Sequence, residues 1–301
     1  MTECWTVLKV LRWTTDYLAG KGISSPRLDA ELLIGSALDK DRVGIYLCYD
    51  QPLEPTELTQ IRQLVARRAN REPLQYILGH TEFWSLPFKV SPGVLIPRGD
   101  TEILVEEVER LLEQSLPTAD DCVLDVGTGS GAIAVAIAHT FKERCPTMRV
   151  DAIDISDEAL TLAQHNAEQN QVAAQIRFHQ CDMAQLNQLS AAKPYRLIVS
   201  NPPYITTAEM AELMPEVLDH EPHLALEAGD DGLQCYRLLC AQALSALQPS
   251  GWLVVEVGAT QAEKVQTMME QAGLEQTFQR QDYSGIARVV GGRSPAAASM
   301  L

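Results

Sequence analysis

The sequence predicts an α/β protein, in which a mostly parallel sheet has helices on both faces and follows a small all-helical N-terminal domain. Two observations predict this architecture. From about residue 121 onward, short apolar runs typical of buried strands alternate with longer runs of helical periodicity, whereas the first ~80 residues show helical periodicity alone. Because parallel strands need crossover connections, this alternation favours a doubly wound, Rossmann-like sheet.

The predicted N-terminal domain covers residues 1–79. Its first helix is indicated by apolar residues on one face, namely Trp5, Leu8, Leu11 and Leu18. A second helix is expected to begin at Ser25-Pro26, and a third after Pro55. The third helix has arginines on the side opposite its apolar residues, namely Arg62, Arg67, Arg68 and Arg71. These arginines indicate either a solvated face or a docking surface for an acidic partner.

Residues 80–96 are rich in aromatic and β-branched residues between prolines, and we expect a β-hairpin that links the two domains. The second domain is expected to cover residues 97–301. Its strands are expected at 122–126, 149–155, 176–181, 197–200 and 252–257, with two late strands near 274–278 and 287–290. Helices are expected at 132–141, from Ser156, at 232–247 and at 260–271. Ligands of such sheets bind beyond the carboxyl ends of the strands.

A glycine-rich turn follows the first of these strands. It reads Asp125-Val126-Gly127-Thr128-Gly129-Ser130-Gly131 and leads into a helix. Glycine lets the backbone turn sharply and approach a ligand closely, and the helix N-terminus offers unpaired N–H groups. The spacing is G-x-G-x-G and not G-x-G-x-x-G, so a pyrophosphate cradle is not favoured.

Two aspartates end the next strands. A carboxylate at Asp154 can accept hydrogen bonds from both hydroxyls of a ribose, and Asp182 stands where a side chain can face an adenine amino group. The alternative for each is a solvated strand end or a helix cap. Together with the glycine turn they describe an adenosine site without phosphate, which S-adenosylmethionine fits, and its sulfonium charge suits an acidic pocket.

Asn201-Pro202-Pro203-Tyr204 directly follows the fourth strand. The alternative interpretation is a simple strand-ending turn. The chemical interpretation is amide or amine recognition. The Asn201 oxygen and a proline-held carbonyl each accept one hydrogen of an NH2 group, and Tyr204 stacks on a flat substrate group. Such acceptors would aim the nitrogen lone pair at a methyl donor, so positioning and electrostatics would drive the transfer. The sequence identifies no general base.

Composition limits the possible classes of function. The formal net charge is −16, and residues 1–80 contribute none of it, because they hold ten basic and ten acidic residues. An acidic second domain would repel a phosphate backbone, so we expect no stable nucleic-acid binding. The seven scattered cysteines show no metal-ligand spacing, and we expect neither a metal site nor disulfides. With no signal peptide and no membrane-length apolar run, we expect a cytoplasmic monomer.

The motifs resemble a known family. The glycine turn, Asp154 and the Asn-Pro-Pro-Tyr segment resemble class I methyltransferases that modify exocyclic or amide nitrogens, whose fold has a seven-stranded sheet. Three further segments are similar to the peptide chain release factor glutamine methyltransferases: Glu72-Pro73-Leu74-Gln75-Tyr76-Ile77-Leu78-Gly79, Phe83-Trp84-Ser85-Leu86-Pro87-Phe88 and Leu95-Ile96-Pro97-Arg98-Gly99-Asp100-Thr101-Glu102. The similarity runs through nearly the whole chain.

The resemblance implies an activity and a site. The substrate would be the glutamine of the Gly-Gly-Gln loop of class 1 release factors, methylated on its side-chain nitrogen. The implied cofactor contacts are Gly127, Thr128, Gly129, Ser130, Gly131, Asp154, Asp182, Met183 and Asn201. The implied substrate contacts are Asn201, Pro202, Pro203 and Tyr204, with Asn201, Pro202 and Tyr204 as catalytic residues. Gly99 replaces a proline usual in the family, and Met183 replaces an aromatic residue found in several members.

Two other functions stay open at this point. An adenine-N6 methyltransferase acting on DNA or RNA shares the Asn-Pro-Pro-Tyr motif but would need a basic groove or a target-recognition domain. A binding protein that retains the fold without methylating would not need Gly127, Asp154 and Asn201 together.

Overall fold

The computed structural model describes residues 5–119, 121–190 and 193–296. The chain forms two compact units. One comprises Met1–Gly79 together with Met214–His220, and we call it the helical unit; the other comprises His80–Leu213 and Glu221–Leu301, and we call it the sheet unit. The segment 214–220 therefore belongs to the helical unit although it lies far from the other residues of that unit in the sequence.

The helical unit packs around one apolar core. Its helices are α1 (Val7–Gly20), α2 (Pro26–Leu38), α3 (Arg42–Leu47), α4 (Pro55–Ala69), α5 (Leu74–Leu78) and α11 (Pro215–Leu218). Leu11 and Leu18 of α1 are fully buried, as are Leu33 and Ile34 of α2. Pro26 occupies the first turn of α2, as the sequence predicts.

The arginines of α4 differ in environment. Arg62 is exposed, and Arg67 forms a surface ion pair with Glu72. Arg68 is only 6% exposed, so the prediction that it lies on a solvated face is wrong. A buried guanidinium is stable only when it is paired, and Arg68 is paired twice, with Asp29 and Glu216.

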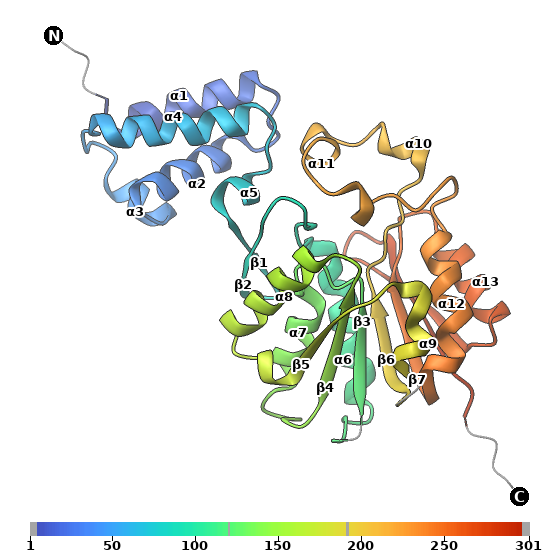
Figure 1. Ribbon diagram of the computed structural model, residues 1–301. Coiled ribbons are helices and arrows are strands. Elements are labelled where there is room, and N and C mark those ends of the chain that lie inside the picture. Colours follow the sequence, from blue (N-terminus) through green and yellow to red (C-terminus); the bar gives the residue numbers. More distant parts are fainter. Residues whose placement is uncertain (1–4, 120, 191–192, 297–301) are drawn as a thin grey trace, which may run out of the picture. The chain divides into compact units, whose positions relative to one another are not determined.

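The sheet unit alternates strands and helices, as the sequence predicts (Figure 1). Its strands are β1 (His80–Phe83), β2 (Leu86–Lys89), β3 (Cys122–Val126), β4 (Arg149–Asp154), β5 (Ile176–Gln180), β6 (Tyr195–Ser200), β7 (Leu247–Glu256), β8 (Glu275–Gln281) and β9 (Ala287–Arg293). Its α-helices are α6 (Glu102–Glu113), α7 (Ala132–Phe141), α8 (Asp157–Gln169), α9 (Leu186–Ser190), α10 (Thr207–Met210), α12 (Gln234–Ala246) and α13 (Ala262–Gln271). Short 3-10 turns are η1 (Gly99–Thr101), η2 (Ala173–Gln175), η3 (Met183–Gln185) and η4 (His223–Ala225).

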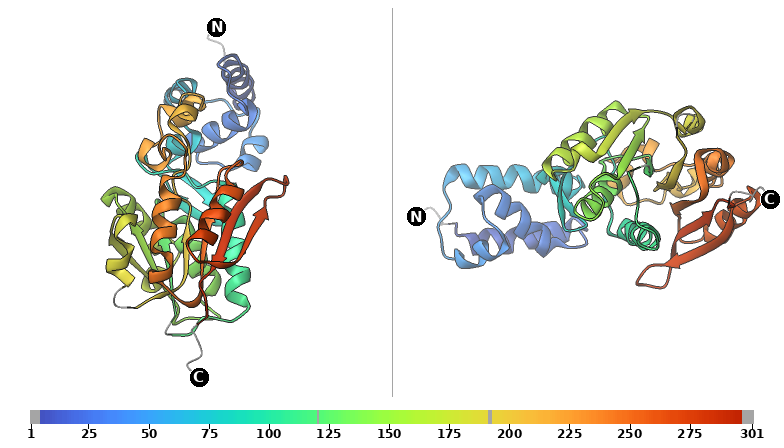
Figure 2. Two further views of the ribbon diagram at one scale, coloured as in Figure 1. Left: turned by 90° about the vertical axis from the view of Figure 1, so that its right-hand side faces the viewer. Right: turned by 90° about the horizontal axis from the view of Figure 1, so that it is seen from below.

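The large sheet has seven strands in the order β5-β4-β3-β6-β7-β9-β8. All neighbours pair in parallel except β9, which runs antiparallel to both β7 and β8. The strands β9 and β8, red in Figure 2, form the end of the sheet that follows β7. The result is the mostly parallel, Rossmann-like sheet that the sequence predicts.

Successive residues of a strand point to opposite faces of the sheet, and both faces are buried because helices pack on each of them. Leu197 and Val199 of β6 belong to the core cluster that contains α6 and α7, whereas Ile198 belongs to the cluster that contains α12 and α13. This is why the central strands read as continuous apolar runs in the sequence.

Strand register decides where the site lies. Val126 of β3 pairs with Ile153 of β4 and with Ser200 of β6, and Ser200 pairs with Val255 of β7. The next residue of each strand therefore lies at one edge of the sheet, and those residues are Gly127, Asp154, Asn201 and Glu256.

The hairpin of β1 and β2 is part of the sheet unit. Its two-residue turn places Trp84 and Ser85 at φ 55° and 56°, which matches the twist that tight hairpins need. Trp84 Nε1 donates to Thr140 Oγ1 at 3.0 Å, and Phe83 and Phe88 pack in the core beneath α6 and α7. Among the described residues, no helix combines the length and the apolar character needed to cross a bilayer.

Candidate active site

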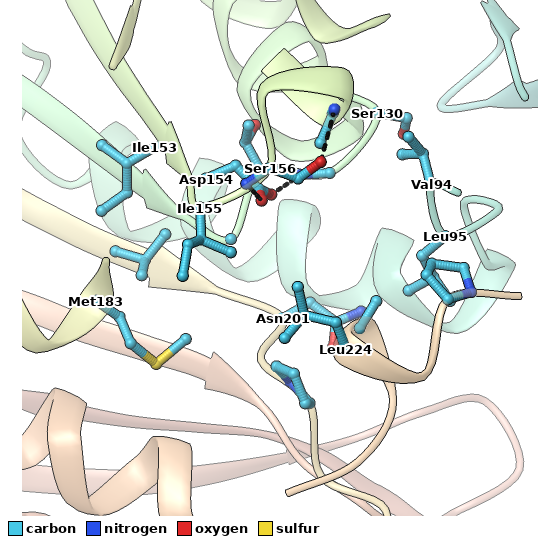
Figure 3. A pocket seen from close by; sticks show the side chains of 18 of the residues that line it. Val94, Leu95, Ser130, Ile153, Asp154, Ile155, Ser156, Met183, Asn201 and Leu224 are labelled. Atoms are coloured by element: carbon cyan, nitrogen blue, oxygen red, sulfur yellow. Dashed lines mark hydrogen bonds between the residues drawn. The ribbon is translucent and has the colours of Figure 1, made fainter. Parts of the chain in front are cut away.

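A cavity of about 630 Å³ opens at the carboxyl edge of the sheet. Nine of the residues singled out from the sequence line it: Gly127, Thr128, Gly129, Ser130, Asp154, Asp182, Met183, Asn201 and Pro203. Figure 3 shows Asp154, Met183 and Asn201 around one hollow. The structure thus brings together side chains from the ends of β4, β5 and β6, as expected for parallel strands that end at one edge.

The glycine turn is held in shape by buried polar groups. The N–H groups of Gly127 and Thr128 both donate to the carbonyl of Ile153 at 2.9 Å. The Asp125 carboxylate accepts from the Thr128 hydroxyl at 2.7 Å and from the Ala134 N–H at 3.1 Å. Burial raises the pKa of Asp125 to about 7. Asp125 does not line the cavity, so it shapes the turn from behind.

Gly127 leaves room for a ligand. Its φ is +73°, a conformation that favours glycine, and a Cβ built there would meet no atom of the described residues within 4 Å. Gly131 behaves differently, because a Cβ there would lie 3.0 Å from the Cβ of Ala163 in α8. Gly131 is therefore needed for helix packing at the start of α7, and it lies outside the cavity lining.

Asp154 is oriented by the backbone around it. Its Oδ2 accepts from the Gly129 N–H at 2.9 Å, and its Oδ1 accepts from the Ser156 N–H at 2.9 Å (Figure 3). A carboxylate offers about four acceptor positions, so each oxygen can still accept a hydrogen bond from a ligand. Asp154 therefore presents a fixed pair of acceptors to the cavity.

Asp182 and Met183 follow β5. One oxygen of Asp182 accepts from the Ala184 N–H at 2.8 Å and caps the turn η3, so the cap that was the alternative interpretation is present. Asp182 also lines the cavity, and capping uses only one of its oxygens. Met183 lines the same wall with its flexible thioether.

Asn201 faces the cavity, and its amide nitrogen is already engaged. Its Nδ2 donates to the hydroxyl of Thr101 at 3.1 Å, which leaves its oxygen free to act as an acceptor. Pro203 lines the cavity, whereas Pro202 is buried outside the lining.

Tyr204 also lies outside the cavity lining. Its ring packs against the core cluster of α12 and α13, and its hydroxyl donates to Glu256 Oε1 at 3.5 Å. Burial, together with the nearby Glu256, raises the pKa of Tyr204 to about 12, so the phenol is neutral and can donate. Its stacking on a substrate group stays a prediction.

Sequence reasoning missed two polar groups of the site, Thr101 and Glu256. Thr101 lines the cavity, and Glu256 is the last residue of β7. Glu256 could have been found by the strand-end argument that identified Asp154, because it is the last residue but one of the strand predicted at 252–257. Thr101 ends no strand, and only its place in the segment 95–102 drew attention to it.

The charged residues of the lining are mainly acidic. In the described part of the chain they are Asp154, Asp182 and Glu227, against one cation, Arg98, which is itself paired with Glu221. Such a lining favours a cationic ligand. Among the described residues, no group of three or more His, Cys, Asp or Glu side chains is placed to hold a metal ion.

Two family models match the chain. The PrmC N-terminal domain matches residues 9–79, and a methyltransferase domain matches residues 117–288. The release factor glutamine methyltransferase of Geobacter sulfurreducens is 48% identical over 97% of this chain and 98% of its own length. The enzyme of the same name from Moorella thermoacetica is 42% identical over 90% and 92%.

A solved structure supports the fold. The catalytic domain of hMettl16, in complex with the MAT2A 3'UTR hairpin 6, superposes with a TM-score of 0.57 at 16% identity. The match covers 79% of this chain and 84% of that chain. At this identity the likeness concerns the fold alone.

Proposed function

The chain belongs to the release factor glutamine methyltransferase family, and we propose that it transfers a methyl group from S-adenosyl-L-methionine to the glutamine side-chain nitrogen in the Gly-Gly-Gln motif of class 1 peptide chain release factors. One observation carries the proposal. Asn201 lines the same cavity as the Gly127 turn and Asp154, so an amide acceptor adjoins a site fit for an adenosine cofactor.

The cavity fits the cofactor in three respects. Gly127 leaves open space where a side chain would stand, Asp154 keeps acceptor capacity for two ribose hydroxyls, and the acidic lining suits a sulfonium cation. Gly127, Gly129, Asp154 and Met183 would hold the cofactor. When bound, S-adenosylmethionine supplies an electrophilic methyl group.

Asn201 would act on the substrate amide. Its oxygen, together with a backbone carbonyl of the Pro202-Pro203 pair, would accept the two hydrogens of the glutamine NH2. The amide lone pair is shared with the carbonyl, so the nitrogen reacts only when it is held in a fixed orientation. The two acceptors would also stabilise the positive charge that develops on nitrogen, and rigid prolines keep the reorganisation small.

The proposed activity can be tested directly. The protein would be incubated with methyl-labelled S-adenosylmethionine and a class 1 release factor, and the loop peptide analysed by mass spectrometry. We expect a mass increase of one methyl on the glutamine and no label on a release factor whose Gln is replaced by Glu. Duplex DNA and RNA hairpins form parallel arms, and label on nucleic acid alone would reject the protein substrate.

Removing the Asp154 carboxylate tests the cofactor site. We expect Asp154→Ala to weaken binding of S-adenosylmethionine by about 10- to 100-fold, because hydrogen bonds to a charged acceptor contribute roughly 1.5–3 kcal/mol. Isothermal titration calorimetry measures the Kd. Asp157→Ala is the matched control, since Asp157 is exposed in the first turn of α8 and lies outside the lining. Equal Kd values for the two variants would reject the role of Asp154.

A further inference from the structure

The orientation of the Asn201 amide matters for the proposed function, on which this inference rests. An asparagine side chain can present either its oxygen or its NH2 group to the cavity, and the two ends have nearly the same shape. Only the oxygen can accept a hydrogen from a substrate NH2. Some other group must therefore hold Asn201 in the useful orientation.

Thr101 contacts the far end of this amide. Its hydroxyl accepts a hydrogen from Asn201 Nδ2 at 3.1 Å, and the Glu256 carboxylate lies next to the same hydroxyl. Thr101 is 5% exposed and Glu256 is 2% exposed, so water competes little for these contacts. Thr101 is the last residue of η1, Asn201 directly follows β6, and Glu256 is the last residue of β7.

The Glu256 carboxylate favours one direction of donation between Thr101 and Asn201. An ionised carboxylate only accepts, so its position next to Thr101 favours the hydroxyl orientation in which the hydrogen points to Glu256. The Thr101 oxygen is then left as an acceptor, and only the NH2 end of Asn201 can satisfy it. In this arrangement the Asn201 oxygen is the end of the amide that stays available to a ligand of the cavity.

Among the residues that the structure describes, no cationic side chain forms an ion pair with Glu256. The groups that face it are Thr101 and Asp100 from η1, Tyr204 after β6, Arg288 from β9 and Tyr236 from α12. Arg288 is engaged by Asp100 at 3.1 Å and by Asp282 at 3.2 Å, and Tyr236 donates to the backbone carbonyl of Glu256. The Glu256 Oε2 atom is buried, and none of the described residues forms a hydrogen bond with it.

We propose that Glu256 and Thr101 are positioning residues that hold the Asn201 amide with its oxygen toward the substrate NH2 group. Neither residue needs to touch the reacting atoms. Their effect is on the rate of transfer and not on binding of the methyl donor, because Asp154 and the glycine turn lie on other strands.

The arrangement of Glu256, Thr101 and Asn201, which we call the relay, predicts that the rate of methyl transfer depends on pH. Burial raises the pKa of Glu256 to about 7. Below this pH the Glu256 carboxyl is protonated and can donate to Thr101. The Thr101 hydrogen is then free to point to Asn201. This favours the opposite orientation of the Asn201 amide, in which the oxygen accepts from Thr101. The rate of methyl transfer should therefore rise as pH increases through about 7. The glutamine amide of the substrate does not titrate in this range. The rise of the rate near pH 7, which we call the pH limb, would therefore report on a group of the enzyme.

The test compares turnover at saturating S-adenosylmethionine and release factor. Thr101→Val keeps the shape but removes the hydroxyl, and we expect kcat to fall about 10- to 100-fold, as expected for a misplaced reactive group. Thr101→Ser restores the hydroxyl and should stay within about threefold of the wild type. Glu256→Gln, which removes the charge without changing the volume, should lower kcat and abolish the pH limb near 7. The Kd for S-adenosylmethionine should change less than about threefold in all three.

Thr277→Val is the matched control. Thr277 Oγ1 donates to Glu270 Oε1 at 2.7 Å, an exposed Thr–Glu hydrogen bond between β8 and α13, outside the cavity lining. We expect wild-type kcat from this variant. The relay is rejected if Thr101→Val keeps near wild-type turnover, if Thr101→Ser is as slow as Thr101→Val, or if Glu256→Gln retains the pH limb. A wild-type protein that leaves the release factor unmodified rejects the proposed function, and the inference with it.

Discussion

Asn201→Ala is expected to lower the rate constant of methyl transfer by about 10²- to 10³-fold, the range found when one fixed polar group is removed from an active site. Asn201 lines the cavity, and its NH2 group is held by Thr101, which leaves its oxygen available as an acceptor. Alanine removes the acceptor, so the substrate nitrogen loses both its orientation and the group that shares its developing charge. Single-turnover methylation of a release factor measures the rate constant directly.

The same variant should bind S-adenosylmethionine almost as the wild type does, because Asp154 and the glycine turn are untouched. Calorimetry checks this. Asn70→Ala, which changes an exposed asparagine at the end of α4, serves as the control and should react at the wild-type rate. An Asn201→Ala enzyme that turns over normally, or one that has lost donor affinity in proportion to its rate, would contradict the acceptor role.

Arg68→Ala is expected to destabilise the helical unit by about 3–5 kcal/mol, the range for breaking a buried ion pair from one side. Arg68 Nε donates to Asp29 at 2.7 Å, and Arg68 Nη1 donates to Glu216 at 3.1 Å. The side chains of all three are at most 10% exposed. Removing the cation leaves two carboxylates buried near each other with too little compensation, although Arg71 still reaches Glu216.

Urea unfolding gives the change in free energy, and hydrogen exchange locates it. We expect faster exchange in peptides of α2, α4 and 214–220, with little change in β3 or β4. Arg67→Ala is the neighbouring control, because the Arg67–Glu72 pair lies at the surface and such pairs contribute about 0–1 kcal/mol. Similar losses in the free energy of unfolding for the two variants would contradict the prediction that the buried ion pairs of Arg68 contribute more than a surface ion pair.

Much of the sheet unit follows from local patterns. β3 occupies residues 122–126 and α7 occupies residues 132–141, the predicted bounds, and the last strands appear where two late strands were expected. These elements are buried on both faces, so their apolar runs are long enough to mark them. The strand-end rule then brought Gly127, Asp154, Asp182 and Asn201 to one cavity.

Other features have no local signature. Arg68 stands on α4 with two further arginines, Arg62 and Arg67, and periodicity indicated a solvated face or a docking surface for all of them. Its burial depends on Glu216, which is 148 residues away and belongs to the segment 214–220. No pattern around Glu216 indicates that this segment packs with the first 79 residues, because ion pairing depends on the folded path of the chain and not on spacing.

The sequence by itself determined the order of strands and helices, the family, and the strand ends at which a methyl donor and an amide could meet, since these depend on periodicity, turn residues and motifs that are contiguous in the chain. Only the tertiary structure decided which polar groups share hydrogen bonds: Thr101 with Asn201, 100 residues apart, and Tyr204 with Glu256. The physical reason is that a buried donor or acceptor takes the partner that folding brings within about 3 Å, and that partner is set by the packing of distant segments.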